Sequence, residues 1–237
     1  MFVRVDVILS PEEVVHHDLA GRVGVVIDVF RFTTTVLAAL EAGIERFYPV
    51  GEVEEAWRLK ASHPKLLLAG ERNALKIPGF DFGNSPLEHH GRRYQGGELV
   101  FTTTNGTRAV RAAREAALVV LACLRSAPAA AAYLADLGQD VVLIPAGLEG
   151  RFSLEDTWCA GLIASLLPGA EYGDGAKAAL ALWAHLPRED LAQSAHGRRL
   201  QALGFSADLS YCLECGVSTG VVLWDPETGW GALGEEG

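Results

Sequence analysis

The feature that most constrains the fold is an alternation of short Val/Ile/Leu-rich runs with longer Ala/Leu-rich stretches of helical spacing. Gly, Ser, Thr or Asn follows each apolar run, which is the order typical of parallel βαβ units. The predicted strands cover residues 2–9, 23–29, 44–50, 65–69, 98–103, 118–123 and 140–145. The predicted helices cover residues 11–19, 33–42, 52–62, 106–116, 127–137, 154–167, 175–185 and 189–203. We therefore expect an α/β fold, layered α/β/α around a largely parallel sheet.

The length of 237 residues suits one α/β domain over residues 1–237. The strand pattern weakens after about residue 167, and one apolar run, Val217–Trp224, follows near the end of the chain. We expect sub-lobes over about 1–167 and 168–237, with the smaller C-terminal lobe packed on the sheet. The Gly- and Pro-rich stretch 76–97 is predicted to be a long loop, and loops of that length inside a domain tend to be functional.

The charge balance restricts the partners. Twenty Lys and Arg against thirty Asp and Glu give a net charge of −10, which disfavours a non-specific nucleic-acid or anionic-membrane binder. No apolar run approaches the roughly 20 residues of a membrane span, so we expect a cytoplasmic protein, and a homodimer by analogy with soluble enzymes of this size. A small anion remains a candidate ligand, because 16 of the 20 cationic residues are Arg, the cation best suited to oxyanions.

Cysteine usage points to no disulfide framework, since the chain has four Cys in 237 residues. Cys212 and Cys215 have CxxC spacing. A zinc site would need two more ligands, and no second CxxC pair exists, so structural zinc is the weaker hypothesis.

The polar residues after the second predicted strand are the clearest candidates for chemistry. Asp28 ends that strand, Arg31 follows, and Thr33, Thr34 and Thr35 stand where the next helix should begin. Ligands of open α/β sheets bind beyond the carboxyl ends of strands, where a helix N-terminus favours an anion. There Asp28 could bind Mg²⁺ or attack phosphorus, and Arg31 could hold a phosphate. The structural alternative is that Thr33 caps the helix and Asp28 pairs with Arg31.

Other predicted strand ends repeat this pattern. Glu71 and Arg72 follow one strand, and the loop after them contains Asn84 and Ser85. The residues after another strand are Thr104, Asn105, Gly106 and Thr107. Two such strand ends side by side would offer a group of donors to an anion, although a turn with a capped helix explains each one alone.

Two acidic residues and one histidine complete the candidates. Ser153 and Asp156 fit a helix-capping pattern, which leaves the adjacent Glu155 free for a hard cation. His196 lies beside a glycine in a polar stretch and could be a general acid for a leaving alcohol, or simply a histidine at a helix end. No nucleophile elbow, Walker A loop or GxGxxG run occurs, which argues against hydrolase-elbow, P-loop and dinucleotide chemistry.

Five ordered segments together resemble the 2-phosphosulfolactate phosphatase family. They are Asp28–Thr35, Gly70–Arg72, Gly79–Pro86, Thr103–Thr107 and Glu155–Gly161. The resemblance covers about residues 24 to 210. It implies a Mg²⁺-dependent phosphatase with an α/β fold that hydrolyses 2-phosphosulfolactate to sulfolactate and phosphate, a step of coenzyme M biosynthesis. One departure is that Phe30 and Phe32 replace smaller apolar residues of the usual pattern, while the polar residues are intact.

Residue pattern and resemblance combine into one prediction for the site. The predicted catalytic residues are Asp28, Arg31 and His196. The predicted Mg²⁺ ligands are Asp28, Glu155 and Asp156, since Mg²⁺ prefers a few carboxylates with retained waters. The predicted substrate-binding residues are Thr33, Thr34, Thr35, Arg72, Asn84, Ser85, Thr104, Asn105, Gly106 and Thr107. The substrate would be a small phosphorylated acid, with or without a sulfonate; the alternative is a non-catalytic anion-binding or regulatory module that uses the same strand ends.

Overall fold

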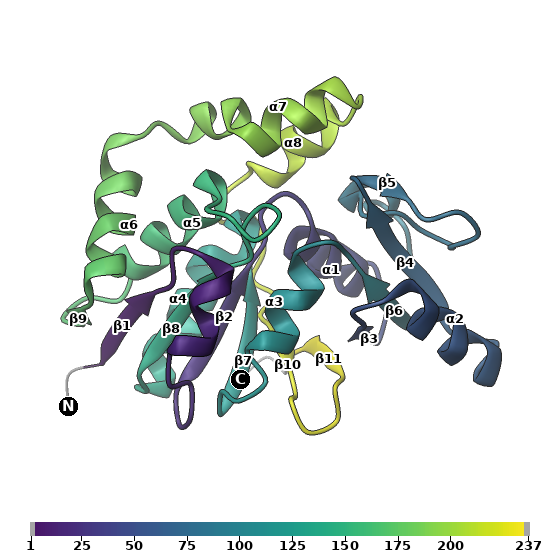
Figure 1. The fold of residues 1–237 in the computed structure, drawn as a ribbon, viewed down its shortest axis with the longest axis horizontal. Coiled ribbons are helices and arrows are strands. Elements are labelled where there is room, and N and C mark those ends of the chain that lie inside the picture. The colour runs from purple at the N-terminus through teal and green to yellow at the C-terminus, as the bar shows by residue number, and fades with distance from the viewer. Residues whose placement is uncertain (1–2, 235–237) are drawn as a thin grey trace.

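A mixed sheet of eleven strands forms the centre of the computed structural model, which describes residues 3–234 (Figure 1). The strands in chain order are β1 (Arg4–Val7), β2 (Val23–Ile27), β3 (Arg46–Pro49), β4 (Leu67–Arg72), β5 (Leu75–Lys76), β6 (Glu98–Thr102), β7 (Leu118–Ala122), β8 (Val141–Pro145), β9 (Glu171–Tyr172), β10 (Val222–Trp224) and β11 (Gly231–Leu233). Across the sheet they are ordered β5-β4-β6-β3-β11-β10-β7-β2-β8-β1-β9. The α/β fold and the largely parallel sheet predicted from the alternation are confirmed.

The sheet consists of two parallel groups joined by an antiparallel hairpin. Strands β7, β2, β8, β1 and β9 form one group, and β3, β6 and β4 form the other. The hairpin β10–β11 pairs antiparallel with β7 on one side and with β3 on the other. Because three successive pairings are antiparallel, the two groups run in opposite directions, yet residues at the carboxyl ends of β2, β4 and β6 line one pocket.

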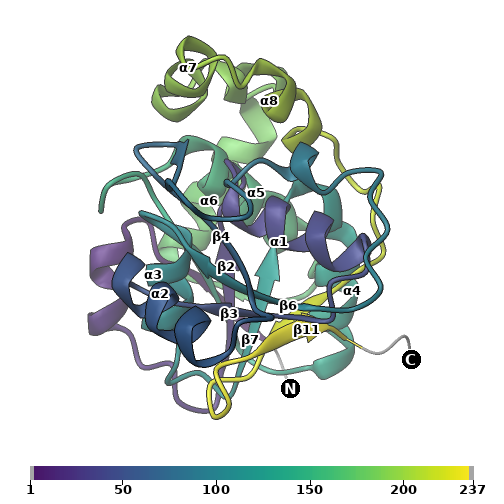
Figure 2. The same ribbon diagram turned by 90° about the vertical axis from the view of Figure 1, so that its right-hand side faces the viewer.

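Helices cover both faces of the sheet (Figures 1 and 2). They are α1 (Phe32–Glu41), α2 (Val53–Ser62), α3 (Gly106–Ala112), α4 (Ala127–Leu137), α5 (Leu154–Ser165), α6 (Asp174–His185), α7 (Ala195–Ala202) and α8 (Ser206–Cys212). Side chains of β2 alternate between two cores, because Val25 packs with α4, α5 and α6, whereas Val26 packs with α1 and α3. A third core lies between α2 and the strands β4 and β6. The layers thus confirm the α/β/α architecture.

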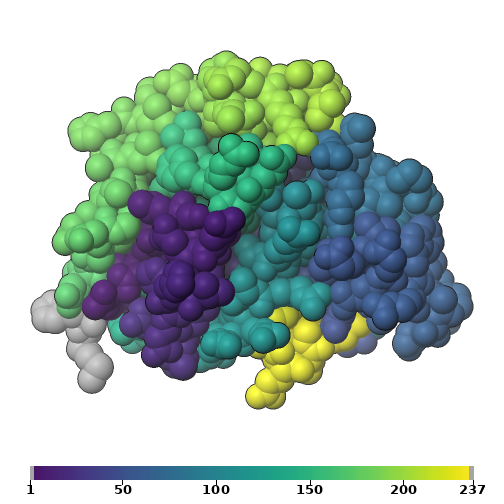
Figure 3. Space-filling model, in the orientation of Figure 1, coloured from purple at the N-terminus to yellow at the C-terminus, as the bar shows by residue number. Residues whose placement is uncertain are grey.

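The region after residue 167 contributes to two places. Helices α6, α7 and α8 cover one end of the molecule, visible as the light green band in Figure 3. The hairpin β10–β11 instead returns to the middle of the sheet, and the predicted apolar run Val217–Trp224 is a strand only at Val222–Trp224. Of the first predicted strand, residue 2 lies outside the described residues, and β1 begins at Arg4.

Two predicted helices were wrong in form. Residues 11–19 were expected to be an α-helix, but Pro11–His16 is a 3-10 helix. Only Val14 of this segment is buried, so it lacks the apolar face whose packing would stabilise a longer α-helix. The predicted helix 189–203 is broken at Ser194, whose extended backbone and side-chain hydrogen bond to the Gly197 N–H begin α7 anew after a 3-10 turn over Arg188–Gln193.

A membrane span is not found among the helices of residues 3–234, since none is both long enough and apolar enough to cross a bilayer.

Candidate active site

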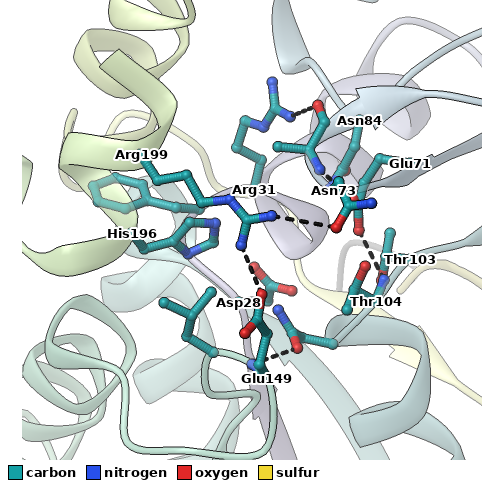
Figure 4. A pocket seen from close by; sticks show the side chains of 14 residues that line it. Asp28, Arg31, Glu71, Asn73, Asn84, Thr103, Thr104, Glu149, His196 and Arg199 are labelled. Carbon is teal, nitrogen blue, oxygen red and sulfur yellow. Dashed lines mark hydrogen bonds and ion pairs between the residues drawn. The ribbon is translucent and has the colours of Figure 1, made fainter. Parts of the chain in front are cut away.

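A polar pocket lies where the carboxyl ends of β2, β4 and β6 meet the C-terminal helices (Figure 4). Six residues predicted for the site line it: Asp28, Arg31, Asn84, Thr104, Asn105 and His196. The other lining residues are Phe30, Glu71, Asn73, Ala74, Thr103, Leu148, Glu149 and Arg199. Segments from residue 28 to residue 199 therefore converge on one pocket, which is lined mainly by polar and charged side chains.

Asp28 is the buried carboxylate at the end of β2. It is 5% exposed, and its Oδ1 accepts a hydrogen bond from the Phe32 N–H at 3.3 Å. Burial raises the pKa of Asp28 to about 6; the charge of His196 and the Phe32 N–H oppose this shift, and Glu71 and Glu155 add to it. Asp28 is therefore ionised at neutral pH in a position that disfavours its charge, as is common for reactive carboxylates.

Gly106 leaves room for the Asp28 carboxylate. A Cβ at this position would lie 2.6 Å from Asp28 Oδ2 and 2.4 Å from Cδ1 of Phe32. Gly106 was predicted to bind substrate, but it does not line the pocket, and its visible role is to let the start of α3 approach Asp28.

Substituting Gly106 by Ala should displace the Asp28 carboxylate. We expect kcat to fall by about 10- to 100-fold, because moving a reacting group by about 1 Å has an effect of this size on the rate. Gly51→Ala is the matched control, because its added Cβ would contact only the end of the Arg111 side chain, at 3.2 Å. Steady-state kinetics of both variants check the prediction, and equal rates for Gly106→Ala and Gly51→Ala would contradict it.

The hydroxyls after β2 build the turn into α1. Thr33 Oγ1 donates to the Asp28 carbonyl at 2.8 Å, and Thr34 Oγ1 donates to the Val29 carbonyl at 3.0 Å. Thr35 Oγ1 is within hydrogen-bond distance of the Arg31 and Asn84 carbonyls. All three side chains are buried, and none lines the pocket, so they fix the backbone around Asp28.

Glu71 joins the ends of β4 and β6 and is buried. Its Oε2 accepts the Ala74 N–H and its Oε1 accepts the Thr104 N–H, both at 2.7 Å. Asn73 in the turn between β4 and β5 has φ 56°, which Asn tolerates better than most residues. Glu71 thus holds two loops together and also faces the pocket.

Helix α3 begins with a reciprocal pair of threonines. The Thr107 N–H donates to Thr103 Oγ1, and the Thr103 N–H donates to Thr107 Oγ1, both at 3.1 Å. Asn105 Oδ1 accepts the Glu149 N–H at 3.0 Å, which links this turn to the loop after β8. Thr107 itself is fully buried and does not reach the pocket.

His196 faces the pocket from α7, with Glu155 behind it. His196 Nδ1 lies 3.1 Å from Glu155 Oε1, and the Glu155 side chain is 1% exposed. Phe30 packs edge-on against the imidazole, with ring centroids 6.1 Å apart. A carboxylate at Nδ1 holds the ring with Nε2 free for the pocket, which is the arrangement of a general acid or base.

Asp156 connects the ends of β2 and β8. Its Oδ1 accepts the Val29 N–H at 2.8 Å, and its Oδ2 accepts the Gly147 N–H at 3.2 Å. Burial raises the pKa of Asp156 well above its usual range, and Glu155 and Asp28 add to the shift. Ser153 caps α5 by accepting the Asp156 N–H, as the capping pattern predicted. Both oxygens of Asp156 are thus directed at backbone, away from the pocket.

Arg31 pairs with a buried acid of α8. Its guanidinium is 2% exposed, donates to Asp208 Oδ2 at 2.5 Å and to the Ala74 carbonyl at 2.8 Å, and lies 4.1 Å from the Phe205 ring. Ser85, which was predicted to bind substrate, does not line the pocket. Its Oγ donates to the other oxygen of Asp208 at 2.7 Å.

Arg72 is directed away from the pocket. It donates to the carbonyls of Glu71 and Gly51 and to Thr102 Oγ1, so it ties the end of β4 to its neighbours. Of the two arginines predicted for the site, Arg31 lines the pocket and Arg72 does not.

Asp28, Glu155 and Asp156, the predicted Mg²⁺ ligands, lie near one another, since Glu155 raises the pKa of the other two, but only Asp28 lines the pocket. Within residues 3–234, no three His, Cys, Asp or Glu side chains are arranged to hold a metal ion. A different oxygen set does face the pocket: Asp28, Glu71, and Asn84, whose Oδ1 is buried without a hydrogen-bond partner in the described chain. Each oxygen of Glu71 accepts one backbone N–H and keeps a second lone pair that can face the pocket. Two carboxylates and an amide oxygen thus fit Mg²⁺ that keeps several waters and a substrate oxygen. The thiols of Cys212 and Cys215 are free, and burial raises the pKa of Cys212 well above its usual range, so it stays a neutral core thiol.

Four polar residues of the site were not predicted from the sequence: Asn73, Glu149 and Arg199, which line the pocket, and Asp208, which pairs with Arg31. Arg199 carried a usable signal, because it follows His196 by three residues and therefore shares its helix face. Glu149 and Asp208 act through partners more than 40 residues away in sequence, for which a single sequence has no signal.

Comparison with known proteins shows which family the chain belongs to. The family model described as 2-phosphosulpholactate phosphatase matches residues 8–226. A probable 2-phosphosulfolactate phosphatase of Carboxydothermus hydrogenoformans is 42% identical over 213 residues, covering 88% of each chain. One of Symbiobacterium thermophilum is 43% identical over 211 residues, covering 85% of this chain and 91% of the relative. One of Deinococcus radiodurans is 42% identical over 203 residues, covering 83% and 85%. The chain belongs to the 2-phosphosulpholactate phosphatase family.

Proposed function

We propose that this protein is a phosphoric monoester hydrolase that cleaves 2-phosphosulfolactate, or a similar small phosphorylated hydroxy acid, to the hydroxy acid and phosphate. The observation that carries the proposal is the placement of Asp28 opposite a histidine–carboxylate pair in one small polar pocket. The names of the relatives support the substrate.

The pocket supplies the two groups that cleavage of a phosphate ester needs. Asp28 Oδ2 is free to act at phosphorus, either as the attacking nucleophile or by orienting the attacking water, because only Oδ1 is engaged by a described residue. His196 Nε2 then gives its proton to the leaving alkoxide oxygen while Glu155 stabilises the ring at Nδ1. If Asp28 attacks, a water then cleaves the phospho-aspartate, supplies the OH of phosphate and returns a proton to His196. If Asp28 orients the water, that water supplies the OH during the attack, and the proton it loses replaces the one that His196 gave up.

A divalent cation belongs to this proposal. Asp28, Glu71 and Asn84 would hold Mg²⁺, which when bound offsets the negative charge of the phosphoryl oxygens. The need for a cation also follows from charge. The carboxylates of Asp28 and Glu71 line the pocket, whereas the guanidinium groups of Arg31 and Arg199 are already paired with Asp208 and Glu149. An anionic substrate would enter such a pocket poorly without a counter-charge.

Replacing His196 by Gln should slow cleavage of an alkyl phosphate by about 10²- to 10⁴-fold, because the leaving alkoxide then receives no proton. Glu155→Gln should lower kcat by about 10- to 100-fold, because the Glu155 carboxylate orients His196 but does not touch the substrate. With p-nitrophenyl phosphate, whose leaving group needs no protonation, both losses should shrink. The exposed His185→Gln at the end of α6 is the matched control. Equal losses on both esters would rule out the general-acid role.

The proposed activity is tested by measuring phosphate release from a panel of small phosphorylated hydroxy acids with and without a sulfonate. We expect turnover of 2-phosphosulfolactate in Mg²⁺ and its loss in EDTA, restored by added Mg²⁺. Turnover that persists in EDTA after exhaustive dialysis would remove the cation from the proposal, and no release from any member of the panel would remove the hydrolase.

A further inference from the structure

Arg199 lies at the mouth of the pocket on α7, one turn after His196 (Figure 4). Its Nη1 donates to Glu149 Oε1 at 2.8 Å, and its Nη2 is 3.5 Å from Asn73 Oδ1. Glu149 belongs to the loop after β8, and Asn73 to the turn between β4 and β5. The guanidinium therefore bridges three segments across the opening.

The two guanidinium groups that line the pocket differ in how firmly they are held. Arg31 is buried and paired with a buried carboxylate, so separating that pair would leave two uncompensated charges. The Arg199 and Glu149 side chains are 35% and 49% exposed, and such an exposed pair is weak because water screens it. An incoming anion can therefore take the place of Glu149 on Arg199, but it cannot take the place of Asp208 on Arg31.

The backbone of Glu149 is fixed independently of its side chain. Its N–H donates to Asn105 Oδ1 at 3.0 Å, and its φ of 54° marks a tight turn. Release of the carboxylate from Arg199 thus leaves the wall of the pocket in place, and the exchange needs only a side-chain rotation.

From these contacts we infer that Arg199 is the specificity-determining residue for the acid groups of the substrate other than its phosphate, and that Glu149 occupies this subsite until substrate binds. The inference rests on the proposed function and extends it: the phosphate lies at Asp28, while a carboxylate or sulfonate of the same small molecule exchanges with Glu149 on the Arg199 fork. A planar guanidinium suits such bidentate oxyanion contacts.

The kinetic test compares 2-phosphosulfolactate with isopropyl phosphate, a phosphate ester of similar shape without carboxylate or sulfonate. In Arg199→Gln we expect the ratio of kcat/KM for the two esters to fall by about 10- to 100-fold, as for the loss of a charge-assisted contact. The matched control is Arg198→Gln on the same helix, an exposed neighbour that removes the same charge without lining the pocket. An unchanged ratio in Arg199→Gln, or an equal fall in Arg198→Gln, would overturn the inference.

A binding measurement keeps the inference separate from the proposed activity. Calorimetric titration with sulfolactate, which has both acid groups and no phosphate, should show about 10- to 100-fold weaker binding to Arg199→Gln. Glu149→Gln should bind it more tightly than wild type, because a competitor for Arg199 and a repelling charge are both removed. Weaker binding to Glu149→Gln would mean that the pair is a structural clamp and would overturn the inference. Failure of wild type to release phosphate from either ester would refute the hydrolase instead, and the titration would still decide the role of Arg199.

Discussion

Asp28→Asn is expected to lose at least about 10³-fold in kcat and to unfold at the same or a higher temperature than wild type at pH 7. The loss follows because an amide neither attacks phosphorus nor balances a cation. The retained stability follows from burial, since Asp28 is 5% exposed and Asn has nearly its shape.

The sign of the stability change depends on pH. The pKa of Asp28 is about 6 in the folded protein, against an ordinary value of 3.8, because burial disfavours the charge. Between about pH 4 and 6 the Asp28 carboxyl is protonated in the folded state and ionised in the unfolded state. The free energy of unfolding of the wild type therefore falls as pH rises through this window. Above pH 6 the ionised Asp28 costs roughly 3 kcal/mol, and Asp28→Asn escapes that cost.

Thermal unfolding in EDTA at pH 4 and pH 8 measures this effect without a bound cation. The melting temperature of Asp28→Asn relative to wild type should rise from pH 4 to pH 8. Retained turnover, or a destabilisation of Asp28→Asn that is the same at both pH values, would contradict the assignment of Asp28 as a strained functional carboxylate.

Asp208→Ala is expected to cost about 3–5 kcal/mol of stability, the largest such effect we predict. The Arg31 guanidinium is 2% exposed and lies against the Phe205 ring, and the substitution would remove its carboxylate partner. It also removes the acceptor of Ser85 Oγ. Because this pair joins α8 to the start of α1, its loss should loosen the C-terminal helices over the pocket and lower kcat as well.

Denaturant unfolding measures the cost, and two variants interpret it. Glu98→Ala breaks the exposed Arg46–Glu98 pair on the sheet and should cost less than about 1 kcal/mol. The double variant Arg31→Met, Asp208→Leu replaces both charges by apolar side chains and should recover much of the stability lost in Asp208→Ala. A cost for Asp208→Ala no larger than that for Glu98→Ala would show that the buried pair does not hold the two helices together.

The sequence predicted the strand ends well, because that signal is local. Asp28 follows one buried apolar run, and Thr103 and Thr104 follow another, so the sequence places all three residues at carboxyl ends of strands. All three line the pocket. The hydroxyls of Thr33, Thr34 and Thr35 lie in the predicted turn, yet they bond to backbone carbonyls. Their role is structural, but the alternative predicted from the sequence was wrong in form: Arg31 and not Thr33 is the N-cap residue of α1, and Arg31 pairs with Asp208 instead of Asp28.

What the sequence could not predict depends on partners distant in the chain. Glu155 and Asp156 are neighbours, but one contacts His196 and the other contacts two backbone amides of strand ends, and only the packing of α5 decides which is which. The hairpin β10–β11 separates the two parallel groups of the sheet although it comes last in the chain. Nothing in a short apolar run such as Val222–Trp224 indicates insertion at the centre of a sheet formed by earlier strands.

Phosphorus NMR of 2-phosphosulfolactate with Mg²⁺ tests most directly whether the pocket around Asp28 cleaves a small phosphate monoester. We predict that catalytic amounts of wild type convert the ester signal into that of inorganic phosphate, while Asp28→Asn leaves the ester intact. The contradictory result is an ester signal that shifts or broadens on saturable binding, with no inorganic phosphate formed at any Mg²⁺ concentration; the protein would then be an anion-binding module and not a phosphatase.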